Sequence, residues 1–176
     1  MKPIRKFSIF AAAAVVLLSL FSCNKELEPI VLTGSWDLDT NGVMVQIIYS
    51  PVVANEFPDA VKFLGENIQK IRRELMKPQR IVFKMPNITE FYYNEVPLPV
   101  AGTFMQENAY FVITNPLFPE SISGASDNIR VELYYDENYL MGIIYRLLTP
   151  EDDPPMVFEE LIVTFNGVGA YKKALN

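Results

Sequence analysis

The chain has 176 residues, and among them there is no histidine and only one cysteine. Without histidine, Ser-His-Asp and Cys-His nucleophile systems, imidazole proton shuttles and histidine metal sites are excluded. With a single cysteine, no disulfide can form within the chain. The sequence also has no glycine-rich phosphate loop and no Gly-x-Ser-x-Gly elbow. These absences leave carboxylate chemistry or no chemistry, and we expect a protein that is not an enzyme and that holds neither a metal nor a cofactor.

Carboxylate chemistry is the one catalytic class that this composition leaves open. A glycan hydrolase would need two carboxyl groups roughly 5 to 10 Å apart in a cleft. The sequence shows no obvious pair of this kind. Glu159 and Glu160 are neighbours in a predicted strand, where successive side chains point to opposite faces. A hydrolase is therefore the least favoured function.

The first 22 residues have the composition of a signal peptide. Lys2, Arg5 and Lys6 form a basic start, and the apolar run 7–21 follows. This run is short for a membrane span, which needs roughly 20 apolar residues. A basic start, a short apolar run and a small residue before the cleavage site are typical of a signal peptide. An uncleaved signal anchor is the alternative.

The single cysteine, Cys23, directly follows the apolar run in the stretch Leu20-Phe21-Ser22-Cys23. This stretch resembles the lipobox of bacterial lipoprotein precursors, in which the cysteine thiol receives a diacylglyceryl group before cleavage. The resemblance implies lipidation at Cys23 and a membrane anchor made of two or three acyl chains. The alternative is an ordinary secreted protein that carries a cysteine here by chance.

Residues 24–28, with the sequence Asn-Lys-Glu-Leu-Glu, follow the cysteine. They resemble the lysine-acidic signal that sends lipoproteins of Bacteroides-type bacteria to the cell surface. The resemblance implies an outer-membrane lipoprotein on the cell surface, with the periplasmic face as the alternative. A plain solvated tether is the other interpretation of this segment. The predicted division is a signal peptide at 1–22, a lipidated tether at 23–30 and one domain at 31–176.

The mature chain is acidic. Residues 1–22 contain three basic and no acidic residues, so their removal shifts the formal charge from −6 to −9. An acidic domain without a basic stripe argues against nucleic-acid binding and against electrostatic attraction to anionic lipid. The acyl chains are therefore predicted to be the only contact with the membrane.

One helix is predicted between Pro58 and Pro78. Asp59 lies near its start, and Arg72 and Arg73 lie near its end, as the helix dipole favours. We expect the helix to pack on the protein's own sheet, and binding to a partner protein is the alternative. Its apolar residues step by three and four along one face, as Val61, Leu64, Ile68, Ile71 and Leu75.

Short strands are predicted on both sides of this helix. Apolar and polar residues alternate after Pro78, which indicates consecutive strands joined by turns in an antiparallel meander. A hairpin turn is predicted at Asp136-Glu137-Asn138. The remaining expectations are a strand at 31–38, a strand or helix approach at 43–49, irregular chain at 51–55, and strands at 139–147 and 157–165, the last ending at Asn166-Gly167.

Thr33-Gly34-Ser35-Trp36 resembles the Gly-x-Trp motif that opens lipocalins and related calycin barrels. The order of strand, helix and meander is also similar to lipocalin-like lipoproteins of Bacteroides-type bacteria. The resemblance implies a mainly β fold, an antiparallel barrel of about eight strands with one long amphipathic helix before the meander. It also implies that Trp36 packs across one end of the barrel beneath an arginine, and Arg130 and Arg146 are both candidates.

A barrel of this size is either filled by its own side chains or holds one small ligand. Because the inward candidates are large, a filled interior is favoured over an open pocket. We expect a lipid-anchored binding or accessory protein of the cell envelope, which could hold a small apolar ligand in the barrel if the interior is open. The alternative is an interaction or inhibitor module with a filled core, whose partner is an envelope protein. The candidate ligand-binding residues, all expected to point inward, are Trp36, Phe91, Tyr93, Phe111, Tyr135 and Tyr145, with Phe83 as a further inward residue.

Overall fold

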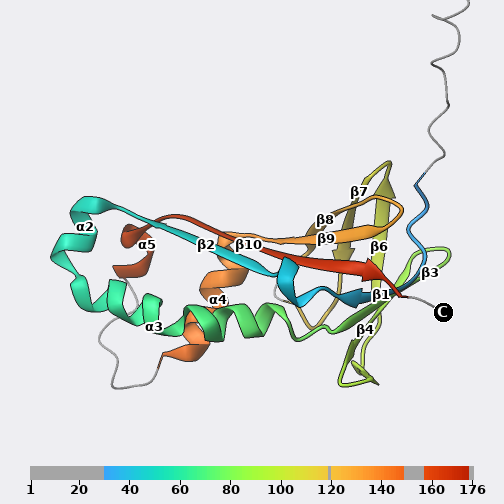
Figure 1. Ribbon diagram of the computed structural model, residues 1–176, viewed down its shortest axis with the longest axis horizontal. Coiled ribbons are helices and arrows are strands. Elements are labelled where there is room, and N and C mark those ends of the chain that lie inside the picture. The colour runs from blue at the N-terminus through green and yellow to red at the C-terminus, as the bar shows by residue number, and fades with distance from the viewer. Residues whose placement is uncertain (1–29, 119, 149–156, 175–176) are drawn as a thin grey trace, which may run out of the picture.

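A computed structural model describes residues 30–118, 120–148 and 157–174. The predicted signal peptide and the predicted lipidation site Cys23 lie outside the described residues. Ten strands and four α-helices make up the described part (Figure 1). No helix within these residues is both long and apolar enough to cross a membrane.

Eight of the strands form a closed antiparallel barrel, which confirms the predicted barrel. Closure comes from β1, because Trp36 lies opposite Ile81 of β3 on one side and opposite Lys173 of β10 on the other. A closed sheet leaves no unpaired edge. The barrel strands in spatial order are β1 (Gly34–Leu38), β3 (Arg80–Lys84), β4 (Ile88–Tyr93), β6 (Gly102–Glu107), β7 (Tyr110–Thr114), β8 (Ile122–Ser126), β9 (Arg130–Tyr135) and β10 (Ile162–Lys173).

Strand β10 is 12 residues long and belongs to both halves of the molecule. Its C-terminal half pairs with β9 and β1 in the barrel, and its N-terminal half pairs with β2 (Met44–Tyr49) in a two-stranded ribbon. A short 3-10 helix, η1 (Thr40–Gly42), joins β1 to β2. A two-residue strand, β5 (Val96–Pro97), pairs with the end of β4.

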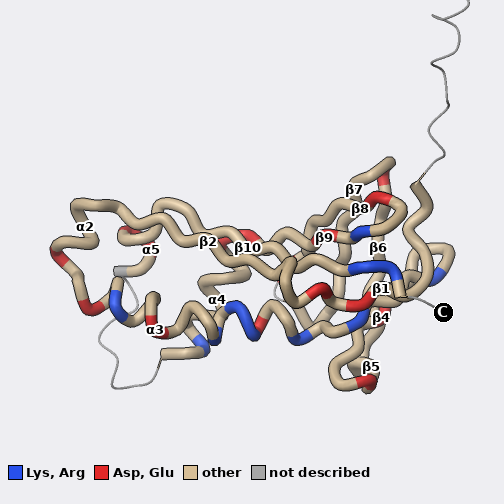
Figure 2. Tube along the Cα trace, viewed as in Figure 1, with Lys and Arg blue, Asp and Glu red and all other residues tan. Residues whose placement is uncertain are grey.

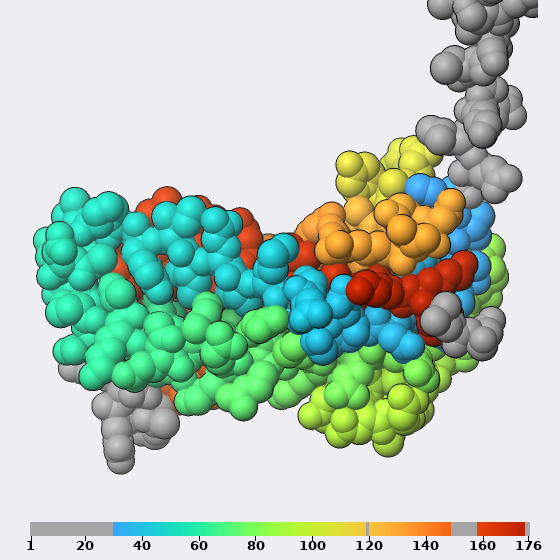
Figure 3. All heavy atoms as spheres, viewed as in Figure 1, coloured from blue at the N-terminus to red at the C-terminus, as the bar shows by residue number. Residues whose placement is uncertain are grey.

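The ribbon and the four helices form an extension that we call the arm. In Figure 1 the arm runs to the left of the barrel, and Figure 3 shows the two as separate lobes. Buried side chains of α3, α4 and α5 nevertheless belong to the same apolar core as the barrel interior. The helices are α2 (Pro51–Glu56), α3 (Pro58–Leu75), α4 (Glu137–Leu147) and α5 (Val157–Leu161).

Helix α3 occupies the segment in which the sequence predicts a helix. Pro58 stands in its first turn, where the missing amide hydrogen costs nothing. Asp59 lies at the start and Arg72 and Arg73 at the end, so charge follows the helix dipole (Figure 2). Of the predicted apolar stripe, the residues most deeply buried are Leu64, Ile71 and Leu75.

Two segments fold differently from their predicted structure. The predicted strand at 139–147 is the helix α4, because Asp136 is its N-cap and accepts a hydrogen bond from the Tyr139 amide at 2.9 Å rather than leading a hairpin turn. The segment 51–55, predicted to be irregular, is the helix α2, with Pro51 in its first turn. Both corrections place helix in the arm.

The last predicted strand is also displaced. Residues 157–161 form α5 instead, and the strand β10 begins at Ile162 and continues to Lys173. Asn166-Gly167, predicted to end the strand, lies in its middle. Gly167 faces α3, where a Cβ atom would lie 2.8 Å from Leu75 Cδ1. The glycine therefore serves close packing between sheet and helix, not a turn.

The barrel has two different ends. We call the first end the tether end, and it contains the turns 85–87, 108–109 and 127–129. The described chain starts at this end, since Gln106 Nε2 near the end of β6 donates to the Ile30 carbonyl at 2.7 Å. At the second, the helix end, α3 leads into β3 and β9 continues into α4. The connections 94–101 and the loop that begins at Asn115 also lie at the helix end.

Aromatic rings occupy the interior of the barrel. The ring of Phe83 lies 5.2 Å from that of Phe104 and 5.6 Å from that of Phe111, both edge to face. Leu32 and Trp36 are buried in the same core. Edge-to-face packing at these distances is favourable beyond the area that it buries. The described interior is therefore packed by the protein's own side chains.

Candidate functional site

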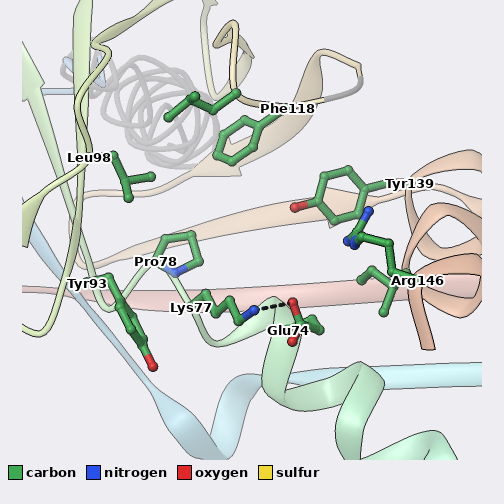
Figure 4. Close-up of a pocket in the computed structure, with 10 residues that line it drawn as sticks. Glu74, Lys77, Pro78, Tyr93, Leu98, Phe118, Tyr139 and Arg146 are labelled. Carbon is green, nitrogen blue, oxygen red and sulfur yellow. Dashed lines mark ion pairs between the residues drawn. The ribbon is translucent and has the colours of Figure 1, made fainter.

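A cavity of about 310 Å³ opens at the helix end of the barrel, between the barrel and the arm (Figure 4). We call it the helix-end pocket. Its volume lies at the lower end of the range for small-molecule sites, which is about 300 to 1,000 Å³. The lining residues come from α3 and the turn that follows it, from β4, from two further loops and from α4, and they are Glu74, Lys77, Pro78, Tyr93, Leu98, Leu117, Phe118, Tyr139, Ile143 and Arg146.

The apolar wall of the pocket is built around Phe118. Its ring contacts Phe91 at 5.0 Å and Tyr139 at 6.3 Å between centroids, so it joins the barrel interior to α4. Asn115 holds the loop in place, because its side chain accepts from the Leu117 amide at 2.8 Å and donates to the Val100 carbonyl at 3.1 Å. These two bonds connect the two loops that line the pocket.

Charged residues stand at the rim of the pocket. Lys77 forms an ion pair with Glu74 in the turn where α3 ends. Arg146 lies in the last turn of α4, and its side chain lies beside Tyr139 in Figure 4. The rim therefore carries two cationic side chains and one carboxylate next to an apolar wall.

Tyr139 provides a polar group within the apolar part of the pocket. Figure 4 shows its hydroxyl directed into the space between Phe118 and Pro78. Burial raises the pKa of the Tyr139 hydroxyl, Arg146 opposes this rise, and Glu74 adds to it. The hydroxyl stays protonated at neutral pH and can donate a hydrogen bond to a bound molecule.

Four of the six predicted ligand-binding residues lie in the packed interior. Trp36, Phe91, Phe111 and Tyr135 are all buried, and burial raises the pKa of the Tyr135 hydroxyl well above its usual value. Trp36 Nε1 donates to the Thr33 carbonyl at 3.2 Å. These positions agree with the predicted inward orientation.

The inward orientation predicted for Tyr93 and Tyr145 is wrong. Tyr93 is 44% exposed because it ends β4 outside the core, and it lines the helix-end pocket. Tyr145 is 41% exposed because it lies on α4, and its hydroxyl donates to Glu159 Oε1 at 3.1 Å. Glu159 itself lies in α5 rather than in a strand. Of the six candidates, Tyr93 is the one that lines this pocket.

The arginine expected over Trp36 is replaced by a lysine. The ammonium group of Lys173 lies 5.8 Å from the centre of the indole ring. Arg130 instead pairs with Glu132 at 2.8 Å, and Arg146 lines the helix-end pocket on α4. Neither candidate arginine occupies the predicted position.

Sequence reasoning did not identify most of the pocket. Leu117 and Phe118 belong to an aromatic and proline-containing loop that is visible in the sequence, but Leu98, Tyr139 and Ile143 carry no such signal. Tyr139 and Ile143 belong to the segment predicted as a strand, and only as part of α4 do they face the pocket together with Arg146.

A second hollow lies on the outer face of the barrel, across β6, β7, β8 and β9. It has a volume of about 720 Å³. Its lining includes the large residues Met105, Tyr110 and Tyr134 and the small residues Ser123 and Gly124. We call this hollow the outer groove.

The described residues contain no group of three or more histidine, cysteine, aspartate or glutamate side chains placed to hold a metal ion. Comparison of the chain with models of protein families, with curated proteins and with solved structures found no match. The class that the fold defines is thus a closed eight-stranded antiparallel barrel with a helical arm.

Proposed function

We propose that this protein is a lipid-anchored binding protein of the cell envelope, and that its ligand occupies the helix-end pocket rather than the interior of the barrel. The observation that carries the proposal is a pocket with an apolar wall and a charged rim at the junction of barrel and arm. The close packing of Phe83, Phe104 and Phe111 argues against a ligand in the barrel interior.

The chemistry of the pocket favours an amphiphilic ligand with an anionic group. Phe118 and Leu98 offer apolar contacts, and the Tyr139 hydroxyl offers a hydrogen bond. Arg146 is suited to an anionic group, because a guanidinium can donate two parallel hydrogen bonds to a carboxylate or sulfonate. Lys77 adds a second positive charge at the rim.

Two fluorescent probes test this site. Anilinonaphthalene sulfonate carries an anionic group, and phenylnaphthylamine is its neutral counterpart. Arg146→Gln should weaken binding of the sulfonate about tenfold, the size expected for a lost charged hydrogen bond, and leave binding of the neutral probe unchanged. Leu117→Trp, which narrows the pocket mouth, should weaken both probes.

The control is Val52→Trp, an exposed residue on α2 that does not line the pocket. It should bind both probes as the unmodified chain does. If Leu117→Trp also leaves both affinities unchanged, the probes bind elsewhere and the pocket is not the ligand site. Equal loss of both probes in Arg146→Gln would show that the pocket does not select an anionic group.

The anchor is tested at Cys23. Cys23→Ser should abolish labelling by radioactive palmitate and release the protein from membranes into the soluble fraction. Persistence of both would refute lipidation at this residue and with it the envelope anchor.

A second function is an interaction or inhibitor module whose partner is an envelope protein. The packed interior and the outer groove favour it, because Met105 and Tyr110 are large and exposed and both line this groove. A photocrosslinker in place of Ser123 should then give a discrete covalent adduct with one protein in whole cells, and one in place of Val52 should not. The absence of such an adduct would remove this alternative.

A further inference from the structure

The turns at the tether end of the barrel expose large apolar side chains. Met85 in the turn after β3 is 65% exposed, Tyr110 next to the β6–β7 turn is 69% exposed, and Ile129 in the turn before β9 is 74% exposed. Each belongs to a different hairpin, and all three hairpins turn at this end (Figure 1). We call these three residues the apolar crown.

Hydrogen bonds order two of the turns that carry or adjoin crown residues, those beside Tyr110 and at Ile129. The Ser126 amide donates to the Ala109 carbonyl at 2.7 Å, which joins the β6–β7 turn to the strand before Ile129. Asp127 Oδ1 accepts from the Ile129 amide at 2.8 Å and from the Arg130 amide at 2.6 Å. Exposure of large apolar side chains to water is unfavourable. A group of them on ordered turns is therefore typical of a surface that contacts a protein or a membrane.

The chain that leads to the predicted anchor leaves the barrel at the same end. The Gln106 side chain donates to the Ile30 carbonyl and accepts from the Leu32 amide at 2.9 Å, so the path of the chain is tied to β6. Cys23 precedes Ile30 by seven residues. An extended chain of that length reaches at most about 25 Å. Acyl chains on Cys23 would therefore hold the tether end close to the bilayer.

We propose that the tether end rests on the lipid bilayer, with Met85, Tyr110 and Ile129 inserted in its interfacial layer. The proposal rests on the acyl anchor of the proposed function and adds a second contact to it, whereas the sequence predicted the acyl chains alone. Tyrosine suits this layer because its ring is apolar and its hydroxyl is polar.

The lysines at this end of the barrel are held by the protein itself. Lys84 at the end of β3 pairs with Glu90, and Lys172 in β10 pairs with Asp39. The proposed contact therefore depends on the apolar crown and not on attraction between lysines and lipid phosphates. The helix-end pocket then opens on the side of the barrel away from the membrane, where a ligand can reach it.

Fluorescence of single labelled cysteines tests the contact. In the acylated full-length protein the Cys23 thiol is a thioether, so an introduced cysteine is the only free thiol. The environment-sensitive dye nitrobenzoxadiazole is attached at Ile129→Cys in the crown and, as the control, at Val52→Cys on the arm. Val52 is 69% exposed, so in the absence of lipid its dye is about as accessible to solvent as the dye at position 129. The protein is reconstituted in vesicles of phosphatidylethanolamine and phosphatidylglycerol that contain nitroxide-labelled lipid.

The dye at Ile129→Cys should be quenched at least about threefold more strongly than the dye at Val52→Cys, because an interfacial side chain lies within about 5 to 10 Å of the acyl boundary. Tyr110→Cys should behave like Ile129→Cys and serves as a second reporter if that variant does not fold. Protein that floats with the vesicles but shows equal quenching at both positions overturns the crown contact and leaves the anchor intact. Protein that does not float overturns the anchor and the contact together.

Discussion

The barrel and the arm reach stability in different ways. In the barrel, each strand has a neighbour on both sides, and the aromatic side chains pack inside a closed sheet. In the arm, β2 is the outer strand of a ribbon and relies on helices for cover. Arg72 of α3 supplies part of this cover, since its guanidinium donates to the carbonyls of Val43 at 3.0 Å and Thr40 at 2.9 Å.

This difference explains where the helix-end pocket lies. A closed barrel with a packed interior has no room for a ligand inside, while the arm is joined to it by loops and helix ends whose side chains cannot fill every space. Phe118 from the barrel loops and Tyr139 from the arm meet at this junction. The barrel thus provides a rigid wall, and the arm provides the second wall with its arginine.

The largest difference in stability between a barrel variant and an arm variant is expected when an aromatic ring is removed. Phe83→Ala in the barrel should lower the free energy of unfolding by roughly 3–5 kcal/mol, because the ring is 1% exposed and the closed sheet cannot collapse around the space. Phe63→Ala in α3 should cost less, about 1–2 kcal/mol, since that ring is only partly buried against Phe158. Chemical denaturation measures both values, and equal losses would contradict the distinction.

Substitution of glycine by alanine should have opposite signs in the two regions. At Gly124 in β8 a Cβ atom would lie 2.3 Å from Phe111 Cζ and 2.5 Å from the Glu132 carbonyl oxygen, so Gly124→Ala should cost about 2–3 kcal/mol. At Gly65 on the exposed side of α3 nothing lies within 4 Å, so Gly65→Ala should stabilise the protein by about 1 kcal/mol. Thermal unfolding distinguishes the two signs. A stabilising Gly124→Ala would refute the close packing of β8 on Phe111.

The same contrast governs what the sequence could predict. In the strand β9 only one periodicity fits, because the buried Val131, Leu133 and Tyr135 alternate with Arg130, Glu132 and Tyr134. In α4 two periodicities fit. Met141 and Ile143 belong to an alternating pattern, but Leu140, Ile144 and Leu147 also step by four and three. The correct choice depended on the Asp136 cap, a local signal that the apolar alternation concealed.

The pocket could be predicted even less well, because its residues come from segments far apart in the chain. Lys77 and Arg146 are separated by nearly the whole meander in sequence, and they line one pocket because α4 packs beside α3 at the end of the closed barrel. Sequence patterns report which face of one element is buried. They do not report which loops meet above a barrel end, and the Tyr93 prediction failed in orientation for this reason.

Loss of the Arg72 contacts should loosen the arm and spare the barrel. Arg72→Gln removes the two charged hydrogen bonds to Thr40 in η1 and to Val43, the residue before β2, and should cost about 1–2 kcal/mol. Hydrogen exchange of the β2 amides should become faster while exchange in β7 and β8 does not change. Arg73→Gln is the matched control, because within the described residues Arg73 donates to the Gln69 carbonyl of its own helix, and its loss should change stability by less than about 0.5 kcal/mol. Equally faster exchange in β7 would show that the barrel depends on the arm.

The smallest expected effect concerns pH, and in contrast to the Arg72 effect it should arise from the barrel and its junction with η1. A hydrogen bond from Lys172 lowers the pKa of the Asp39 carboxyl, and hydrogen bonds from Lys84 and Tyr92 lower that of Glu90. A carboxyl whose pKa is lower in the folded state adds stability above its unfolded pKa and loses it as the pH falls through the folded value. Stability should therefore decline below about pH 4.

The double variant Asp39→Asn with Glu90→Gln should make this decline shallower in urea unfolding measured at successive pH values. Glu66→Gln, which removes an exposed ion pair of the arm spanning 4.0 Å, should leave the slope unchanged. A shallower decline in Glu66→Gln and not in the double variant would place the acid sensitivity in the arm instead.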